Sequence, residues 1–485
     1  MKKSLFKNTI YKTLLSFVNI VVPILVGPYV TQLLDVELYG TYNAVYADFQ
    51  VFLTFAAFGI YIFGVREISK IRNDKKKVSE LFTNLFCISI ISNVTVLLVY
   101  LLYAFITSSG TALLLYIIMT IQIVGNIFYI EFINEALENY KFITIKTTII
   151  RILYLVLVFL IVRKSEDVAL YAIIVSGIVF LNNIVSFIYA KKYIKFDLKN
   201  IKIRKYIPSL FTILIITNIE LLYSQLDRVM LGKFDEVAVT IYYIPYYILY
   251  TLASIPYSVI NVSIPRLSYL IANDTKENYL FSLNKIISSV YFLMLPMCFG
   301  IIALAYEIIY IYAGENYLEC VSVLVIACIY RIFLSTESTL THLVMYPHNK
   351  EKSLLKLSFS CGLVNLVINI LLIVFKVFTP FTAMATTMMV EVLLIILEYR
   401  FASKKLDVRP KYFSKQNIIY LVLSALFIPI ALLVKAINFG FALNTIIIIV
   451  LCVALYGGVL LIIKDENVYL IINKFLGKLR RKKNA

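Results

Sequence analysis

The feature that most constrains this chain is a series of apolar runs, each about 20 residues long, that recurs along nearly its whole length. A helix of that length, rising about 1.5 Å per residue, crosses roughly 30 Å of hydrocarbon. Inside hydrocarbon every backbone polar group needs an internal partner, so a span is a helix or part of a closed barrel. The runs lack the alternation of barrel strands. The sequence therefore predicts an all-α polytopic membrane protein with about fourteen transmembrane helices.

The apolar runs give the positions of the predicted spans. Those of the first half lie at residues 12–34, 41–64, 81–106, 111–133, 144–162, 168–190 and 207–231. Those of the second half lie at residues 239–262, 284–306, 318–346, 354–375, 378–399, 417–436 and 441–463. The loops between them are short, so no soluble catalytic domain is attached.

The positive charges predict the orientation. Lys and Arg gather in short cytoplasmic loops of membrane proteins, and with an inside start most of the 46 basic residues fall in inside segments. Six fall in outside loops, and these are Arg163, Lys164, Arg228, Lys233, Lys376 and Lys435. We therefore expect both termini in the cytoplasm, with the protein in the cytoplasmic membrane.

Several classes of function do not fit the sequence. The net charge of +18 is spread over all inside segments and forms no single patch, which argues against nucleic-acid binding. Clusters such as Lys75–Lys77 would rest against anionic lipid headgroups. The six cysteines show no metal-ligand spacing. No GxxxxGK[ST] pattern is present, so no ATP site and no other cofactor or metal is expected.

Two outer turns carry a weak internal similarity. They are LLDVELYGTY at 33–42 and LGKFDEVAVTIYY at 231–243, and each joins the first two helices of its half. A basic hinge, Lys191–Lys205, separates the halves. Two repeated halves are the usual basis of alternating access in transporters.

Several motifs occur in an order that is typical of one family. They are LLDVELYGTY at 33–42, FGIYIFGVREISKIRNDKKK at 58–77, NEALENYKFITIKTTIIRI at 134–152, LDRVMLG at 226–232, SIPRLS at 263–268, YAGENY at 312–317 and VNLVINILLI at 364–373. With them the chain resembles the Wzx-like oligosaccharide flippase (polysaccharide biosynthesis protein) family of the multidrug/oligosaccharidyl-lipid/polysaccharide exporter superfamily. Thr240 departs from the pattern, since relatives often have Gly there.

The resemblance implies two six-helix lobes around a central cavity and two additional helices. The expected lobes are residues 1–190 and 207–400, with a cytoplasmic linker at 191–206 and the extra helices and basic tail at 401–485. The implied function is the transfer of undecaprenyl-pyrophosphate-linked oligosaccharide from the inner to the outer leaflet, for a capsule or O-antigen-like surface polysaccharide. Implied partners are this lipid-linked oligosaccharide, membrane lipids, a polysaccharide polymerase and assembly proteins.

Intramembrane charges are the first candidates for a site that binds a pyrophosphate. Arg331 lies midway along the tenth span, and Ser335, Ser338 and His342 share its helical stripe. Arg pairs well with phosphate oxygens, although a structural pair with a carboxylate of a neighbouring helix is an equal alternative. Arg66, at the inner end of the second span, is either an interface anchor or a contact for the entering pyrophosphate.

Four acids are candidates for a proton or coupling-ion site that would use an H⁺ or Na⁺ gradient. Glu220 and Asp227 share a face of the seventh span, while Asp48 and Glu391 are isolated within apolar sequence. A raised pKa would let an isolated acid carry a proton. For Asp227 a local structural role near Arg228 is the favoured alternative.

Other polar residues favour structural roles. Glu131, Glu135 and Glu138 recur on one face near Lys146 and Arg151, which indicates a cluster of ion pairs. Asn365 and Asn369 share a helix face and are expected to join helices.

Two other functions fit the topology. One is a drug/cation antiporter of the same superfamily, which would need an acidic cavity. The other is a polysaccharide-polymerase-type membrane enzyme, which usually has a large outer loop. The short outer loops favour a transporter over an enzyme.

Overall fold

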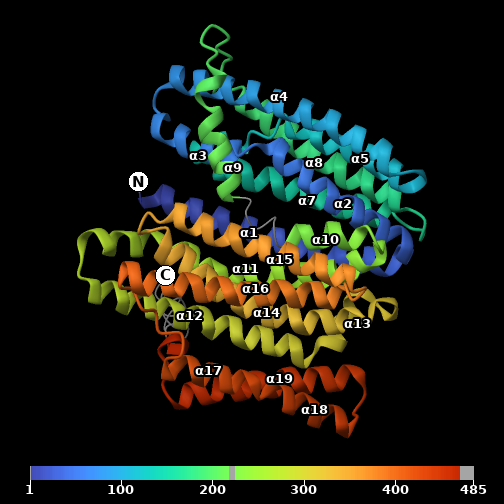
Figure 1. Ribbon diagram of the computed structural model, residues 1–485, viewed down its shortest axis with the longest axis vertical. Helices are drawn as coiled ribbons and strands as arrows, with labels where there is room; N and C mark the ends of the chain where they lie inside the picture. Colours follow the sequence, from blue (N-terminus) through green and yellow to red (C-terminus); the bar gives the residue numbers. More distant parts are fainter. Residues whose placement is uncertain (1, 218–223, 470–485) are drawn as a thin grey trace, which may run out of the picture. The chain divides into compact units, whose positions relative to one another are not determined.

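The computed structural model describes residues 2–217 and 224–469, and within those ranges the chain forms helices and turns but no strand. It separates into two compact units, Met1–Tyr243 and Ile244–Ala485. Figure 1 labels the helices of both. The all-helical fold expected from the apolar runs is confirmed.

Unit 1 contains ten helices within its described residues and the beginning of an eleventh. They are α1 (Lys2–Leu33), α2 (Val36–Ala57), α3 (Ile60–Ile71), α4 (Lys75–Thr107), α5 (Gly110–Asn126), α6 (Glu131–Ala136), α7 (Tyr140–Ile161), α8 (Val168–Ala190), α9 (Ile207–Thr217), α10 (Ser224–Gly232) and α11 (Glu236–Asn273), which continues into unit 2. In this unit α5 packs against α8, α1 against α7, and α2 against both α4 and α5.

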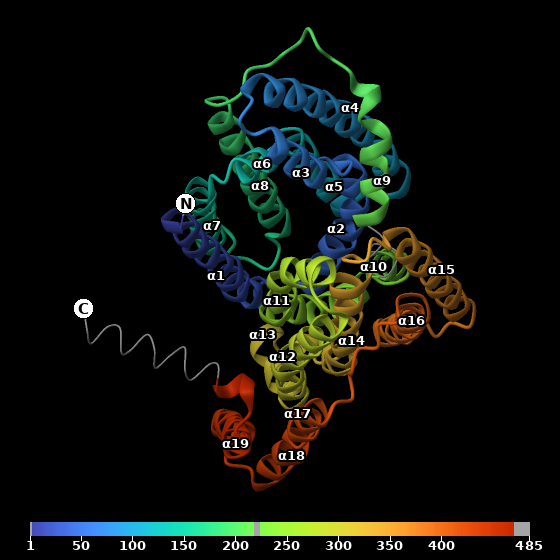
Figure 2. The ribbon, with the colours of Figure 1, turned by 90° about the vertical axis from the view of Figure 1, so that its left-hand side faces the viewer.

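Unit 2 is built around α14 and α16. Its helices after α11 are α12 (Lys276–Ala303), α13 (Ala305–Ala313), α14 (Cys320–Leu340), α15 (Glu351–Val374), α16 (Pro380–Phe401), α17 (Lys415–Ala425), α18 (Phe427–Ile437) and α19 (Phe441–Ile462). A π-helical turn, Thr341–Met345, extends α14. The last three helices pack on α12 (Figure 2). The contact is an apolar cluster that includes Leu295, Tyr420 and Tyr456.

Twelve helices of the described residues are long and apolar enough to cross a membrane, which supports a multi-pass membrane protein. The other two predicted spans correspond to α1, whose apolar part is Phe17–Leu33, and to the stretch of α9 and α10. Residues 218–223 between α9 and α10 lie outside the described ranges, so the count of fourteen stays a prediction. The lobe boundaries at 190 and 207 also stay predictions. The two compact units are divided between Tyr243 and Ile244.

Several spans are broken where hydropathy predicts continuous helices. Between α2 and α3, Phe58 and Gly59 adopt φ of 48° and 69°, in the left-handed region. A Cβ on Gly59 would lie 2.9 Å from the Leu210 carbonyl oxygen of α9, so only glycine fits this close approach. Breaks also separate α5 from α6 and α12 from α13. Membrane helices tolerate such breaks where the surrounding protein supplies partners for the freed backbone groups.

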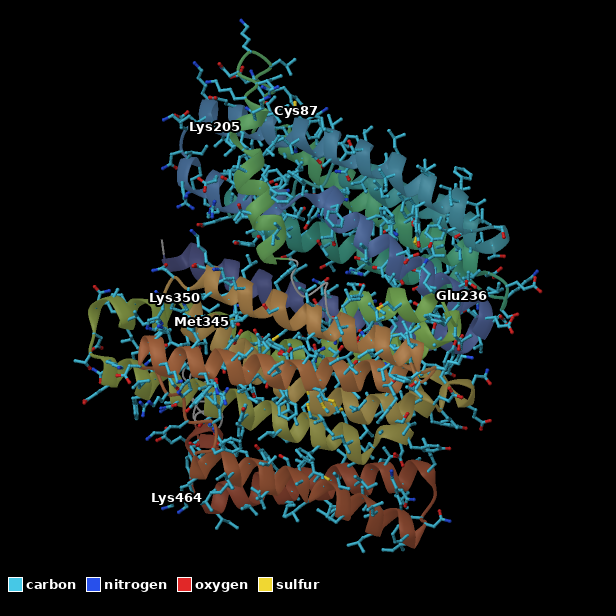
Figure 3. All side chains as sticks on the ribbon, viewed as in Figure 1. Cys87, Lys205, Glu236, Met345, Lys350 and Lys464 are labelled. Atoms are coloured by element: carbon cyan, nitrogen blue, oxygen red, sulfur yellow. The ribbon has the colours of Figure 1, made fainter. Side chains whose placement is uncertain are left out.

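Three labelled lysines and Glu236 show where predicted loops lie within each unit (Figure 3). In unit 1, Lys205 of the predicted inner linker and Glu236 of a predicted outer turn lie at opposite ends of the helices (Figure 3). In unit 2, Lys350 and Lys464, both predicted to be inside, lie at the same end (Figure 3). These placements agree with the predicted alternation, but which end faces the cytoplasm stays a prediction.

Candidate functional site

The buried polar stripe of α14 is the candidate functional site in unit 2. Arg331 and Ser335 lie on this helix with 4% and 0% of their surface exposed, and Ser338 is also buried. His342 follows in the π-helical turn and stacks on Tyr346, with 5.4 Å between the ring centroids. Because α14 packs against both α12 and α16, the stripe lies among helices rather than in a loop.

Arg331 has no carboxylate partner among the described residues. None of the ion pairs found there includes Arg331, and its Nε has no hydrogen-bond partner. The guanidinium carbon lies 5.8 Å from the centroid of the Tyr246 ring of α11. A cation over an aromatic face is attracted to it, but an aromatic ring offers no counter-charge. The described residues thus do not supply the carboxylate pair that was the alternative for Arg331.

The serines of the stripe are used locally. The Ser335 hydroxyl donates to the Ile332 carbonyl oxygen at 2.7 Å, and the Ser338 hydroxyl donates to Glu337 Oε2 at 3.3 Å. Tyr257 of α11 lies within electrostatic reach of Arg331, Ser338 and Glu337. The structure therefore brings Arg331 and Ser338 to one neighbourhood, whereas Ser335 bonds to its own helix.

Two carboxyl groups that the sequence analysis did not single out lie beside this stripe, Glu337 on α14 and Glu398 on α16. Thr341 Oγ1 lies 2.5 Å from Glu337 Oε1, and 3.2 and 3.4 Å from the two carboxylate oxygens of Glu398 on α16. Glu398 is fully buried. Glu391, one of the predicted coupling acids, lies seven residues earlier on α16, is also buried, and interacts electrostatically with Glu398.

Glu398 was missed because it stands at the end of an apolar run, where an acid at the membrane surface is ordinary. The only sequence signal was its spacing of seven residues from Glu391, which puts both on one helix face.

The other predicted coupling acids have partners in unit 1. Asp48 Oδ2 accepts hydrogen bonds from Tyr116 at 2.5 Å and Tyr103 at 2.7 Å, and lies 3.3 Å from Lys233 Nζ. Asp227 is fully buried and accepts a bond from the Tyr242 hydroxyl at 3.0 Å. Glu220 lies outside the described residues. Two hydroxyl donors and an ammonium group around Asp48 favour a structural role for this carboxylate.

Arg66 lies at a half-exposed position. Its Nε donates to Glu67 Oε1 at 2.8 Å, and its guanidinium lies 5.7 Å from the Phe63 ring centroid. With 54% of the side chain exposed, this geometry is that of an interface anchor, and a contact with an entering pyrophosphate stays a prediction.

The polar residues that were predicted to have structural roles form ion pairs and hydrogen bonds in the structure. Lys146 Nζ lies 2.8 Å from Glu131 Oε2 in a buried ion pair, and Arg72 pairs with Glu138 at 2.6 Å. The amide of Asn365 donates to Thr387 of α16 at 3.0 Å, which joins α15 to α16. These residues are therefore accounted for by packing.

Comparison with known proteins gives the family. Residues 5–271, more than half of the chain, match the family described as "Polysaccharide biosynthesis protein". Over 184 residues the chain is 25% identical to a protein of Escherichia coli (strain K12) described as "Putative O-antigen transporter". That match covers 36% of this chain and 43% of the relative, so the chain matches less than half of the relative's length.

Two solved structures show the fold. The lipid II flippase MurJ, in an inward closed conformation, superposes with a TM-score of 0.68 at 14% identity, covering 94% of this chain and 100% of MurJ. An outward-facing multidrug resistance transporter of the MATE family superposes with a TM-score of 0.56 at 15% identity, covering 84% and 96% of the two chains.

At such low identities the likeness to these structures concerns the fold alone. The family match confirms the resemblance seen in the motifs. The chain belongs to the polysaccharide biosynthesis protein family, with the fold of the multidrug/oligosaccharidyl-lipid/polysaccharide exporter superfamily, and is a multi-pass protein of bacterial membranes.

Proposed function

We propose that this protein is a flippase that moves an undecaprenyl-pyrophosphate-linked oligosaccharide from the inner to the outer leaflet of the cytoplasmic membrane by alternating access. The observation that carries the proposal is Arg331, a buried guanidinium in a membrane helix with no carboxylate partner among the described residues. The product would serve a capsule or O-antigen-like surface polysaccharide, together with a polymerase and assembly proteins.

A pyrophosphate fits Arg331 for physical reasons. A charged side chain deep in a membrane is costly, and such residues mark substrate or ion pathways. The guanidinium stays charged at every physiological pH, so it cannot avoid this cost by losing a proton. Its planar fork of donors matches phosphate oxygens, and charge-assisted bonds of this kind are about twice as strong as neutral ones. A visiting anionic headgroup would supply the counter-charge.

The comparisons support a transporter of this class. The family is one of polysaccharide biosynthesis, one relative is described as a "Putative O-antigen transporter", and the fold is similar to that of a lipid II flippase. These likenesses are to transporters, which supports transport rather than an enzymatic reaction.

Direction would come from coupling to an H⁺ or Na⁺ gradient. We propose the carboxylates of unit 2, Glu391 and Glu398, as the first candidates for the coupling group, because both are buried. Asp227 follows, whereas Asp48 already faces two hydroxyl donors and Lys233. A drug/cation antiporter is the second candidate function, since the same buried acids would suit a cationic substrate.

The experiment compares Arg331→Ala and Arg331→Lys in vesicles that hold the protein and a lipid-linked oligosaccharide. We expect Arg331→Ala to lower the rate of leaflet transfer at least tenfold, and Arg331→Lys to restore it in part, because Lys keeps the charge but loses the bidentate geometry. Membrane protein levels serve as the folding control. Full transfer by Arg331→Ala would exclude this role, and export of cationic dyes by the wild-type protein without glycan transfer would favour the antiporter.

A further inference from the structure

The two similar outer turns of the sequence lie against each other in unit 1. Asp35 caps α2 by accepting bonds from the backbone N–H groups of Glu37 and Leu38 at 3.0 and 3.1 Å. Asp235 does the same at the start of α11, accepting from the Val237 N–H at 2.9 Å. The two turns are therefore alike in structure as well as in sequence, and each leads into the second helix of its half.

Polar side chains join the two turns. The Thr41 hydroxyl donates to Glu236, and Asn43 Nδ2 donates to Thr240 Oγ1 at 2.8 Å, with both residues of the latter pair buried. Lys233 Nζ lies 3.3 Å from Asp48 Oδ2. Three residues of α2 are thus bonded to the connection between α10 and α11 or to the first turns of α11.

Glycines allow the backbones to approach closely. A Cβ on Gly40 would lie 3.0 Å from the Val237 backbone nitrogen and 3.1 Å from the Glu236 carbonyl oxygen. A Cβ on Gly232 would lie 3.3 Å from the Ala44 Cβ. At Gly40 the neighbouring atoms are backbone and have little room to give, so this contact tolerates no side chain.

We infer that these contacts form an outer latch, made by Gly40, Thr41, Asn43 and Asp48 of α2 with Gly232, Lys233, Glu236 and Thr240. It joins the two predicted lobes, residues 1–190 and 207–400, at the predicted outer end and has to open in each transport cycle. The inference rests on the proposed function, because alternating access requires the outer ends of the two halves to separate before a headgroup reaches the outer leaflet.

The chemistry of the latch suits repeated opening. Its links are hydrogen bonds and one ion pair, and water replaces the partners of such groups when they separate at a wet surface. A cavity of about 560 Å³ opens beside Thr41 and Glu236, so water already reaches this contact. Glu236 lies at the end of unit 1 opposite Lys205 (Figure 3). α11 begins in the latch and continues into unit 2, so a rearrangement of unit 2 acts on it directly.

A disulfide across the latch tests this inference. In a background without the six native cysteines, Ala44→Cys with Gly232→Cys places two Cβ atoms about 3.3 Å apart, close to the distance that a disulfide needs. We expect oxidation to lower leaflet transfer at least tenfold and reductant to restore it. The matched control is Gly125→Cys with Phe180→Cys, whose Cβ atoms would be about 3.4 Å apart between α5 and α8. That cross-link lies within the first six predicted spans and should leave transfer unchanged.

Two further measurements distinguish a failure of the latch inference from a failure of the proposed function. Unchanged transfer by the oxidised latch variant would overturn the latch. If no variant transfers glycan even when reduced, the proposed function fails, and the latch is then judged by labelling Asn43→Cys with a membrane-impermeant maleimide. If the latch opens, Asn43→Cys should be labelled several-fold faster when Lys233→Ala is also present, because that substitution removes the ion pair with Asp48. Labelling no faster than that of the fully buried Val158→Cys would overturn it.

Discussion

At the scale of residues, some buried charged side chains have a partner of opposite charge among the described residues and others do not. In unit 1, Lys146 pairs with Glu131, and Asp48 lies beside Lys233. In unit 2, Arg331 and Glu398 have no partner of opposite charge among the residues that the structure describes. Removing an ion from water costs several kcal/mol unless it is compensated. Arg331 keeps its charge, whereas a carboxyl group can escape the cost by holding a proton.

The hydrogen-bond geometry around Thr341 indicates that one neighbouring carboxyl group holds a proton. Its hydroxyl has one hydrogen but lies within bonding distance of both Glu337 and Glu398. One hydroxyl hydrogen cannot serve both carboxylates fully, so two full hydrogen bonds here require that one of the two carboxyl groups holds a proton. The other titratable groups within electrostatic reach of Glu398 are Glu391, Cys361, Tyr346 and Tyr412. None of these four groups brings a positive charge, and Glu398 has no ion-pair partner among the described residues.

We predict that Glu398→Gln folds normally but loses dependence on a proton gradient. Glutamine is uncharged and can still donate to Thr341, so the melting temperature in detergent should stay within a few degrees of the wild-type value. The rate of leaflet transfer by Glu398→Gln should then be the same with and without an imposed pH gradient. Glu466→Gln is the control, because Glu466 is an exposed partner of Lys285. Retained gradient dependence in Glu398→Gln would assign the proton to another group.

At the scale of elements, the apolar runs predicted most spans but not their interruptions. A hydropathy window sums over about 19 residues and is blind to a local change of backbone direction. The break at Phe58 and Gly59 therefore fell inside a predicted continuous helix, although Gly59 itself was a visible signal. Likewise Arg331 was identified because it interrupts an apolar run, whereas Glu398 became a buried group only when α14 and α16 packed together.

The break between α2 and α3 gives a stability prediction. Gly59→Ala forces a side chain into a left-handed conformation, 2.9 Å from the Leu210 carbonyl oxygen, and we expect a loss of about 1–3 kcal/mol. Gly177→Ala in α8 is the control, since a Cβ there meets nothing within 4 Å and alanine favours a helix by about 0.5–1 kcal/mol. Thermal unfolding in detergent should show a lower midpoint for the first variant and an equal or higher one for the second. Equal shifts of the unfolding midpoint in the two variants would contradict the backbone strain that we assign to position 59.

For the whole molecule, the charge distribution and the fold give independent information about orientation in the membrane. The fold places Lys205 and Glu236 at opposite ends of unit 1 without saying which end is inside (Figure 3). The charge distribution breaks that symmetry, because basic loops stay on the cytoplasmic side. Together they predict that the linker around Lys205 is cytoplasmic and that the latch faces outward.

Cysteine labelling in intact cells tests this orientation. Phe234 is 65% exposed beside the latch, and Lys205 is exposed in the linker, so single cysteines at these positions in a cysteine-free background report on the two ends. We expect Phe234→Cys to react with a membrane-impermeant maleimide in intact cells, and Lys205→Cys to react only after permeabilisation. The reverse pattern would put the latch at the cytoplasmic end. It would then hold back entry of the lipid-linked glycan instead of its release, while Arg331 would keep its proposed role.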